Sequence, residues 1–163
     1  MRISLADEHA TRALGVRLGT VAQRGAVIAA HGTLGAGKTC LAQGVARGLA
    51  VPSDHYVNSP TFAIMQVYPG RLTFYHIDLY RIGDPDEAYG LGLEEAVGTD
   101  GVAYVEWPSR LPELFPRDLL HVHLELEGDG RAASFTATGP LSEAWLARSF
   151  EDERPEIKKL TIL

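Results

Sequence analysis

Residues 32–39 read GTLGAGKT, which matches the pattern G-x-x-x-x-G-K-[ST] at every fixed position. An apolar run at residues 27–30 comes directly before this segment, and Leu41, Val45 and Leu49 follow it at helical spacing. A loop of this kind works between a strand and a helix. Its glycines turn backbone N–H groups inward, and the helix adds the positive end of its dipole, so that together they bind phosphate oxygens. The segment therefore predicts an α/β fold with a nucleotide-binding loop.

The loop predicts ATP and Mg²⁺ as cofactors. Lys38 is expected to reach the terminal phosphates, and the hydroxyl of Thr39 is expected to ligate Mg²⁺. The sequence has no N-K-x-D motif of the GTPase type, which favours ATP. The alternative interpretation, a glycine-rich turn with a helix N-cap, is disfavoured by the strand before the loop and the helix after it. The residues predicted to surround the nucleotide are Gly32, Thr33, Leu34, Gly35, Ala36, Gly37, Lys38, Thr39 and Cys40.

The composition is that of an ordinary globular chain of 163 residues, which we expect to form a single domain over residues 1–163. Acidic residues outnumber Lys and Arg by 21 to 15, a formal charge of −6, which disfavours extensive direct binding to nucleic acid. No apolar run is long enough to span a membrane, and the N-terminus lacks the apolar core of a signal peptide. We therefore expect a cytoplasmic protein, and the single cysteine, Cys40, agrees with a reducing compartment.

Two acidic residues end apolar runs and can complete a site beside the loop. Asp78 follows FYHI, and Glu106 follows VAYV. Because functional groups of open α/β sheets lie at the C-terminal ends of the strands, both carboxylates are expected near the loop. We assign Glu106 to Mg²⁺ together with Thr39, and Asp78 either to the metal as a further group or to the attacking water. The alternative for both is a carboxylate that only caps the end of a strand.

The SPTF segment at residues 59–62 lies between the helix that follows the loop and the next strand. In nucleotide-binding proteins of this type, a hydroxyl at such a position often senses the γ-phosphate. Thr61 is therefore a candidate switch residue. The alternative is an ordinary proline turn that enters a strand.

The rest of the chain predicts further helices and strands. Ser4 with Asp7 resembles a capping box, which predicts a first helix over residues 5–22. The strand-like runs at residues 61–68 and 72–78 predict a hairpin. We also expect a helix beginning near Asp84, a strand at 101–106, an antiparallel hairpin at a sheet edge from 120–126 and 131–138, a final helix at 140–150, and a tail at 151–163 that packs as a short strand or stays disordered.

His121 and His123 alternate with apolar residues in the run at residues 120–126. This alternation is typical of a half-exposed strand, so we interpret the two histidines as part of a solvated strand face. The alternative is metal ligation, which no accompanying cysteine or acidic cluster supports.

Four stretches together resemble one known family. They read GTLGAGKT at 32–39, SPTF at 59–62, HIDLYR at 76–81 and VEWPSR at 105–110. Their order and spacing are similar to those of the TsaE proteins, small bacterial P-loop ATPases required to form threonylcarbamoyl-adenosine in tRNA. The resemblance covers most of the chain up to residue 126, and the residues beyond carry little of it.

The resemblance implies a P-loop three-layer α/β sandwich with a central, mostly parallel sheet. It implies slow hydrolysis of ATP by the chain alone. It also implies a working complex with the TsaB and TsaD proteins, in which TsaD transfers the threonylcarbamoyl group and ATP hydrolysis resets the pair. The tRNA would then meet this chain only indirectly, through its partners, which agrees with the acidic charge.

Residue by residue, the resemblance implies a nucleotide site at 32–39 and Mg²⁺ positions at Thr39 and Glu106. Asp78, within the HIDLYR stretch, matches the essential acidic position of the family. Thr61 matches its switch threonine.

The resemblance also implies roles for further residues, and this chain departs from the family pattern at three positions. Trp107 matches the tryptophan next to the metal-binding acid, and Asp7, Glu8 and Thr11 match an N-terminal segment of the family that borders the adenine. Thr33 stands where an acidic or amide residue is usual, Cys40 replaces a common second threonine, and Ser109 replaces a frequent Glu or Gln. All three lie beside the predicted chemistry, where they can alter rate or partner contact.

Two other functions fit a phosphate-binding loop. A small kinase acting on a metabolite or nucleoside usually carries an Arg-rich lid over the phosphates, and no such segment is evident in the sequence. A nucleotide-gated binding module without turnover would keep its function when Asp78 or Glu106 is replaced by alanine.

Overall fold

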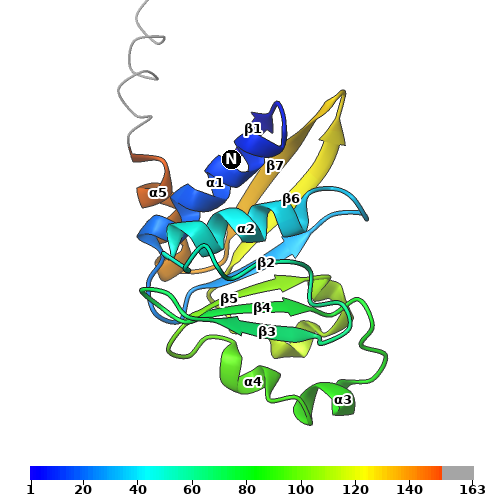
Figure 1. The fold of residues 1–163 in the computed structure, drawn as a ribbon. Helices are drawn as coiled ribbons and strands as arrows, with labels where there is room; N and C mark the ends of the chain where they lie inside the picture. Colours follow the sequence, from blue (N-terminus) through cyan, green and yellow to red (C-terminus); the bar gives the residue numbers. More distant parts are fainter. Residues whose placement is uncertain (152–163) are drawn as a thin grey trace, which may run out of the picture.

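The computed structural model describes residues 1–151 and contains one seven-stranded sheet. The strands run across the sheet in the order β1-β7-β6-β2-β5-β4-β3. β2 is therefore central, with β6 on one side and β5 on the other (Figure 1). The strand bounds are β1 Arg2–Leu5, β2 Val27–His31, β3 Met65–Tyr68, β4 Phe74–Asp78, β5 Val102–Glu106, β6 Leu120–Glu127 and β7 Gly130–Ala137.

The middle of the sheet is parallel and both of its sides are antiparallel. β6, β2, β5 and β4 run in one direction. β3 pairs antiparallel with β4 on one side, and β7 and β1 complete the other side in antiparallel fashion. This confirms the predicted α/β class with a mostly parallel centre and an antiparallel edge. Because parallel strands end on the same side of a sheet, the segments that follow β2, β4 and β5 come together there.

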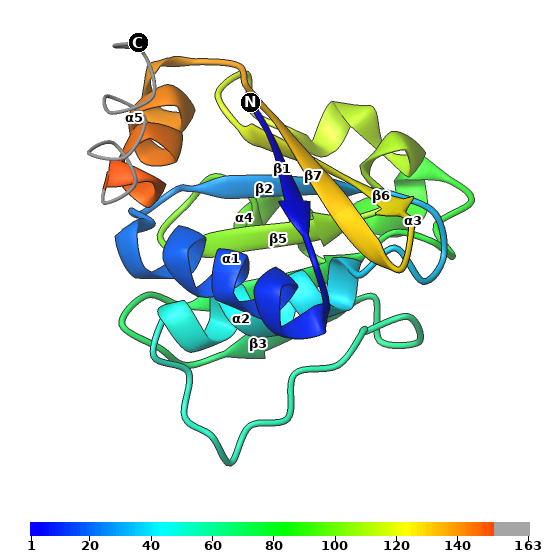
Figure 2. The ribbon, with the colours of Figure 1, turned by 90° about the horizontal axis from the view of Figure 1, so that it is seen from above.

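Helices cover both faces of the sheet. Figure 1 shows α1 and α2 on one face and α3 and α4 on the other, and Figure 2 shows α1 lying alongside α2. Two hydrophobic cores result: Leu18 of α1 and Val45 of α2 belong to one, and Leu93 of α4 belongs to the other. The helix bounds are α1 Glu8–Val21, α2 Lys38–Gly48, α3 Pro85–Tyr89, α4 Leu93–Ala96 and α5 Pro140–Ser149, with 3₁₀ turns η1 Pro108–Arg110 and η2 Pro112–Leu114.

Glycines let α1 and α2 approach until their backbones touch. A Cβ atom added at Gly15 of α1 would lie 2.4 Å from the carbonyl oxygen of Leu41. A Cβ atom added at Gly44 of α2 would lie 2.2 Å from the carbonyl oxygen of Arg12. Both distances are far below a van der Waals contact, so no larger residue fits at either position. The close contact fixes α2, and with it the loop that precedes α2.

The N-terminus differs from the prediction. The first helix begins at Glu8, and Asp7 is its N-cap, with a carboxylate oxygen 2.8 Å from the amide nitrogen of Ala10. The predicted start at residue 5 and the capping box at Ser4 are therefore wrong. Residues 2–5 instead form β1, whose partner β7 lies far along the chain, where Arg2 pairs with Ser134. A pairing over this distance has no signature in the local pattern.

Both predicted hairpins form. β3 and β4 are antiparallel, as are β6 and β7. The second hairpin makes up the antiparallel side of the sheet, but its outermost strand is β1, and β6 lies inside, parallel to β2. The helix predicted to begin near Asp84 forms as α3, and the carboxylate of Asp84 accepts the amide of Asp86 at 2.9 Å. Among the described residues, no helix is long and apolar enough to cross a membrane. The predicted tail lies outside the described residues, apart from Glu151.

Candidate functional site

The predicted phosphate-binding loop connects the end of β2 with the start of α2. Gly32 and Gly37 have positive φ angles of 145° and 104°, which L side chains rarely adopt. A Cβ atom at Gly32 would also lie 2.6 Å from the carbonyl oxygen of Leu124 on β6. Gly37 is the N-cap of α2, so the first turn of the helix faces the loop directly. The local geometry is therefore that of a phosphate cradle at a helix N-terminus.

Lys38 folds back over the loop. Its ammonium donates hydrogen bonds to the carbonyl oxygens of Gly32 at 2.8 Å and Thr33 at 2.9 Å. The same Nζ atom lies 4.1 Å from the ring centroid of Trp107, a cation–π contact. Burial lowers the pKa of Lys38, while the carboxylates of Glu106 and Asp78 oppose this shift. The carbonyl oxygens and the ring thus hold a buried cation in place at the loop.

Glu106 connects the loop with the neighbouring strands. It is the last residue of β5 and is 3% exposed. Its Oε1 atom accepts a hydrogen bond from Thr39 Oγ1 at 3.1 Å and lies 2.9 Å from His76 Nε2 on β4. The other ring nitrogen of His76, Nδ1, has no hydrogen-bond partner among the described residues. The imidazole therefore has one polar contact, and that contact orients the carboxylate of Glu106.

Asp78 ends β4 directly beside the end of β5, where it pairs with Glu106 in the ladder. Its Oδ2 atom accepts hydrogen bonds from Ser59 Oγ at 2.6 Å and Thr61 Oγ1 at 3.0 Å. Its Oδ1 atom accepts the backbone amide of Tyr80 at 2.9 Å. Asp78 is 2% exposed, so these donors replace the water that a carboxylate would otherwise bind. The SPTF segment is thereby attached to the acid at the strand end.

Trp107 has an unusual backbone conformation next to Glu106. Its φ of 58° is left-handed, which is rare for a bulky residue. This turn directs the indole towards Lys38, and the ring of Tyr80 lies against it with the centroids 5.0 Å apart. Strained residues of this kind cluster at functional sites. Together the two rings form an aromatic wall beside the loop.

These side chains surround one pocket of about 340 Å³. It lies where β2, β4 and β5 end, as expected for an open α/β sheet. The lining brings together the predicted residues Lys38, Thr39, Asp78 and Glu106. The other lining residues are Glu8, Leu34, Gly35, Gly37, Cys40, Ser59, Thr61, Tyr80, Trp107 and Arg131.

Of the predicted nucleotide-site residues, Gly32, Thr33 and Ala36 do not line this pocket, and neither does Thr11. Thr11 is fully buried, and its hydroxyl donates to the carbonyl oxygen of Asp7 at 3.1 Å. Glu8, one helical turn earlier, lines the pocket instead. Cys40 lines the pocket as predicted, and burial raises the pKa of its thiol.

Four residues of the site were not predicted as site residues: His76, Ser59, Tyr80 and Arg131. His76 contacts Glu106, Ser59 donates to Asp78, and Tyr80 lies against Trp107, and all three belong to the SPTF and HIDLYR stretches. Arg131 lies at the start of β7, and its Nε atom donates to the carbonyl oxygen of Ala36 at 3.1 Å. It brings a positive charge to the loop from a distant strand. Since no local motif surrounds it, only the topology of the sheet reveals its position.

Comparison with known proteins explains why these features occur together. The sequence model described as "Threonylcarbamoyl adenosine biosynthesis protein TsaE" matches residues 5–133 of this chain. The chain belongs to the TsaE family. The match includes the loop, both strand-end acids and Trp107. Membership assigns the chain to the biosynthesis of threonylcarbamoyladenosine in tRNA.

Relatives named tRNA threonylcarbamoyladenosine biosynthesis protein TsaE match over most of their length. The protein of Bacillus subtilis (strain 168) is 40% identical over 131 residues, which cover 79% of this chain and 80% of the relative. The protein of Treponema pallidum (strain Nichols) is 35% identical over 130 residues, which cover 80% of this chain and 95% of the relative. That of Nostoc sp. is 41% identical over 116 residues, covering 68% and 70%.

The fold has a close counterpart among solved structures. The structure titled "Crystal structure of Bacillus subtilus YdiB" superposes with a TM-score of 0.81 at 30% sequence identity. The superposition covers 94% of this chain and 95% of the other. The superposition therefore covers a larger share of the chain than residues 5–133, the segment that the TsaE sequence model matches.

Proposed function

We propose that this TsaE protein is a Mg²⁺-dependent ATPase whose turnover supports threonylcarbamoyladenosine formation. The observation that carries the proposal is the convergence of Lys38, Thr39, Asp78 and Glu106 on one pocket beside a helix N-terminus. Hydrolysis of a nucleoside triphosphate requires three kinds of group. They are a cradle for phosphate, a hydroxyl next to a carboxylate for the metal ion, and a second carboxylate for the attacking water.

Thr39 and Glu106 have the chemistry needed to hold Mg²⁺. Both offer oxygen atoms, which Mg²⁺ prefers, and the two atoms lie 3.1 Å apart on the floor of the pocket. When bound, Mg²⁺ supplies positive charge to the β- and γ-phosphates, where negative charge develops. His76 keeps the carboxylate of Glu106 turned towards Thr39.

Lys38 binds the terminal phosphates by exchanging the acceptors of its hydrogen bonds. Its ammonium now donates to the carbonyl oxygens of Gly32 and Thr33, which phosphate oxygens would replace. A charge-assisted bond to phosphate is stronger than a bond to a neutral carbonyl, so the exchange favours the bound state. The ring of Trp107 limits how far the ammonium can move.

Asp78 orients the attacking water in this proposal. Its carboxylate is held by Ser59, Thr61 and the amide of Tyr80, so its direction is fixed before any ligand enters. The bond from Thr61 also connects the SPTF segment to this acid. A change at the γ-phosphate can therefore reach the surface of the protein through Thr61.

The biosynthetic pathway indicates which proteins this ATPase acts on. We propose that the chain acts in the cytoplasm on a complex of TsaB and TsaD, and that ATP turnover resets this complex between rounds of transfer. Family membership supports the pathway, and the net charge of −6 supports an indirect contact with tRNA.

Nucleotide binding is tested first with Lys38→Ala. We expect calorimetric titration with Mg²⁺–ATP to show a loss of affinity of about tenfold or more, since a buried charge-assisted contact to phosphate is removed. Arg24→Ala is the matched control, because Arg24 is exposed and remote from the loop. Unchanged affinity in Lys38→Ala would contradict the assignment of the site.

Turnover is tested with Asp78→Ala, measured alone and with the TsaB–TsaD pair and tRNA. We expect the variant to bind ATP with near-normal affinity and to lose hydrolysis by about a hundredfold, the loss typical of a positioned catalytic group. Asp100→Asn, an exposed acid whose side chain is 93% accessible, serves as the control. Full turnover in Asp78→Ala would refute its role, and turnover indifferent to the partner pair would refute the proposed place in the pathway.

A further inference from the structure

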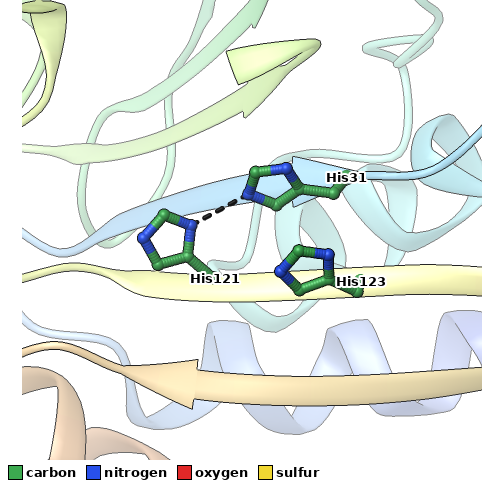
Figure 3. Close-up of side chains that lie close together, drawn as sticks. All are labelled: His31, His121 and His123. Carbon is green, nitrogen blue, oxygen red and sulfur yellow. Dashed lines mark hydrogen bonds between the residues drawn. The ribbon is translucent and has the colours of Figure 1, made fainter. Parts of the chain in front are cut away.

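Three histidines gather on one face of the sheet, outside the pocket described above. His31 ends β2, and His121 and His123 lie on β6 (Figure 3). His31 Nε2 and His121 Nδ1 share a hydrogen bond of 2.9 Å, and the rings of His31 and His123 stack with their centroids 4.1 Å apart. Within residues 1–151, these form the one group of three or more His, Cys, Asp or Glu side chains with ligand atoms close enough to share a metal ion.

The sheet itself fixes the three positions. β2 and β6 are parallel neighbours, and their register pairs His31 with His123 and Ala29 with His121. His121 and His123 are two residues apart, so both side chains point to the same face of β6. His31 points to that face as well, because neighbouring residues in a ladder share a face. The hydrogen bonds of two strands, rather than a mobile loop, thus set the spacing of the rings.

The spacing of the ring nitrogens is near that of a metal centre. One nitrogen from each ring lies within 4.8 Å of the others. Three imidazoles on a tetrahedral Zn²⁺ have nitrogens about 3.3 Å apart, given Zn–N distances of 2.0–2.1 Å. The rings of His31 and His123 are stacked at an interplanar angle of 7°, so they have to rotate about their side-chain bonds before both can direct a nitrogen at one ion.

Two of the three rings, those of His31 and His121, have a lowered pKa. Burial, and then the neighbouring imidazoles of His123 and His121, lower the pKa of His31 to about 4. Burial and His123 lower the pKa of His121 as well. A neutral imidazole offers a lone pair to a cation, so the lowered pKa values of His31 and His121 favour metal binding, while the positions of the three rings carry the proposal.

We propose that His31, His121 and His123 form a binding site for a divalent transition metal ion, with Zn²⁺ as the best-suited cation. Three nitrogen ligands suit Zn²⁺ and its neighbours in the transition series, whereas Mg²⁺ prefers oxygen. His123 is exposed and borders a groove of about 460 Å³, so an ion can reach the cluster from solvent on the side of this ring. The site differs in ligand chemistry and position from the Thr39–Glu106 pair, and it does not depend on the proposed ATPase function.

The site adjoins the phosphate-binding loop through the backbone. His31 is followed directly by Gly32, whose carbonyl oxygen accepts a hydrogen bond from the ammonium of Lys38. The groove beside His123 is lined by Gly32, Thr33 and Trp107 as well. A metal at the three histidines therefore restrains the first residue of the loop.

Zn²⁺ titration of the full chain tests the proposal. The heat of binding is measured by calorimetry in the presence of excess Mg²⁺, which occupies oxygen ligands but competes weakly for imidazole. We expect one Zn²⁺ per chain in the wild type, and a loss of affinity of about tenfold or more in each of three single variants, because even the outer partners of metal ligands contribute that much. The variants are His31→Gln, His121→Gln and His123→Gln.

His9→Gln is the matched control, since His9 is an exposed histidine on α1 outside the cluster. It should bind Zn²⁺ like the wild type. Circular dichroism establishes that each variant is folded before it is titrated. Co²⁺ gives a second readout, because its visible absorption distinguishes nitrogen-rich tetrahedral coordination from an aquated ion. Equal Zn²⁺ affinity in the wild type and the three cluster variants, or a Co²⁺ spectrum of the aquated ion, would overturn the proposal.

Discussion

Glu106 is held by residues from two different elements, Thr39 at the start of α2 and His76 on β4. Both His76 and Glu106 are almost completely buried, so water cannot replace either contact. The apolar run before Glu106 made this acid predictable from the sequence. Its partner His76 was not predicted as a site residue, because the contact crosses between two strands and depends on their register, which pairs His76 with Tyr104.

Replacing His76 by phenylalanine keeps a ring of similar size but removes the contact with Glu106. We expect the Mg²⁺ concentration that gives half-maximal ATP hydrolysis to rise by about tenfold, the size of effect typical for partners that orient metal ligands. Affinity for ATP without Mg²⁺ should stay the same, and His76→Gln should recover part of the loss because its amide can donate to the carboxylate. An unchanged Mg²⁺ dependence in His76→Phe would show that His76 only fills space.

Among the secondary-structure elements, α2 is held both at its start and along its side. It begins at the loop, and its glycines meet the backbone of α1, so the end of the helix next to the loop is fixed from two sides. The sequence predicted α2 itself from the spacing of Leu41, Val45 and Leu49. It did not predict the contact with α1, because a glycine in a helix has no periodic pattern that distinguishes close packing from a weak helix position.

Gly44→Ala tests this contact. The added Cβ atom would lie 2.2 Å from the carbonyl oxygen of Arg12, a backbone atom that cannot rotate away. We expect the free energy of unfolding to fall by about 1–3 kcal/mol, as for other overpacked positions, in urea denaturation. Gly83→Ala is the control, because a Cβ atom at Gly83 would meet nothing within 4 Å. Equal stability of the two variants would mean that the helices separate freely.

At the scale of the whole molecule, the site depends on the order of the strands. The ends of β2, β4 and β5 come together only because these strands are neighbours and parallel. The motifs predicted this edge of the sheet correctly. They could not predict β1, Arg131 or the cluster of His31 with His121 and His123, since each of these depends on pairing between segments far apart in the sequence.

Ligand binding at this edge should stabilise the whole domain. At an Mg²⁺–ATP concentration of about one hundred times Kd, we expect stabilisation by about 2.7 kcal/mol, because the ligand binds the folded state alone. Thermal unfolding with ATP, with and without Mg²⁺, measures this effect. The Glu106→Gln variant should lose the stabilisation that depends on Mg²⁺ and keep the stabilisation that ATP alone provides. A melting temperature that does not respond to ATP would contradict binding.

The central place of β2 has a consequence for synthesis on the ribosome. β2 and its loop are made early, but β5 and β6, the two strands that flank β2, leave the ribosome much later. Until they emerge, neither Glu106 nor the backbone of Leu124 is present to hold the loop in shape. We therefore expect the loop to reach the surroundings described above only once β6 has been made.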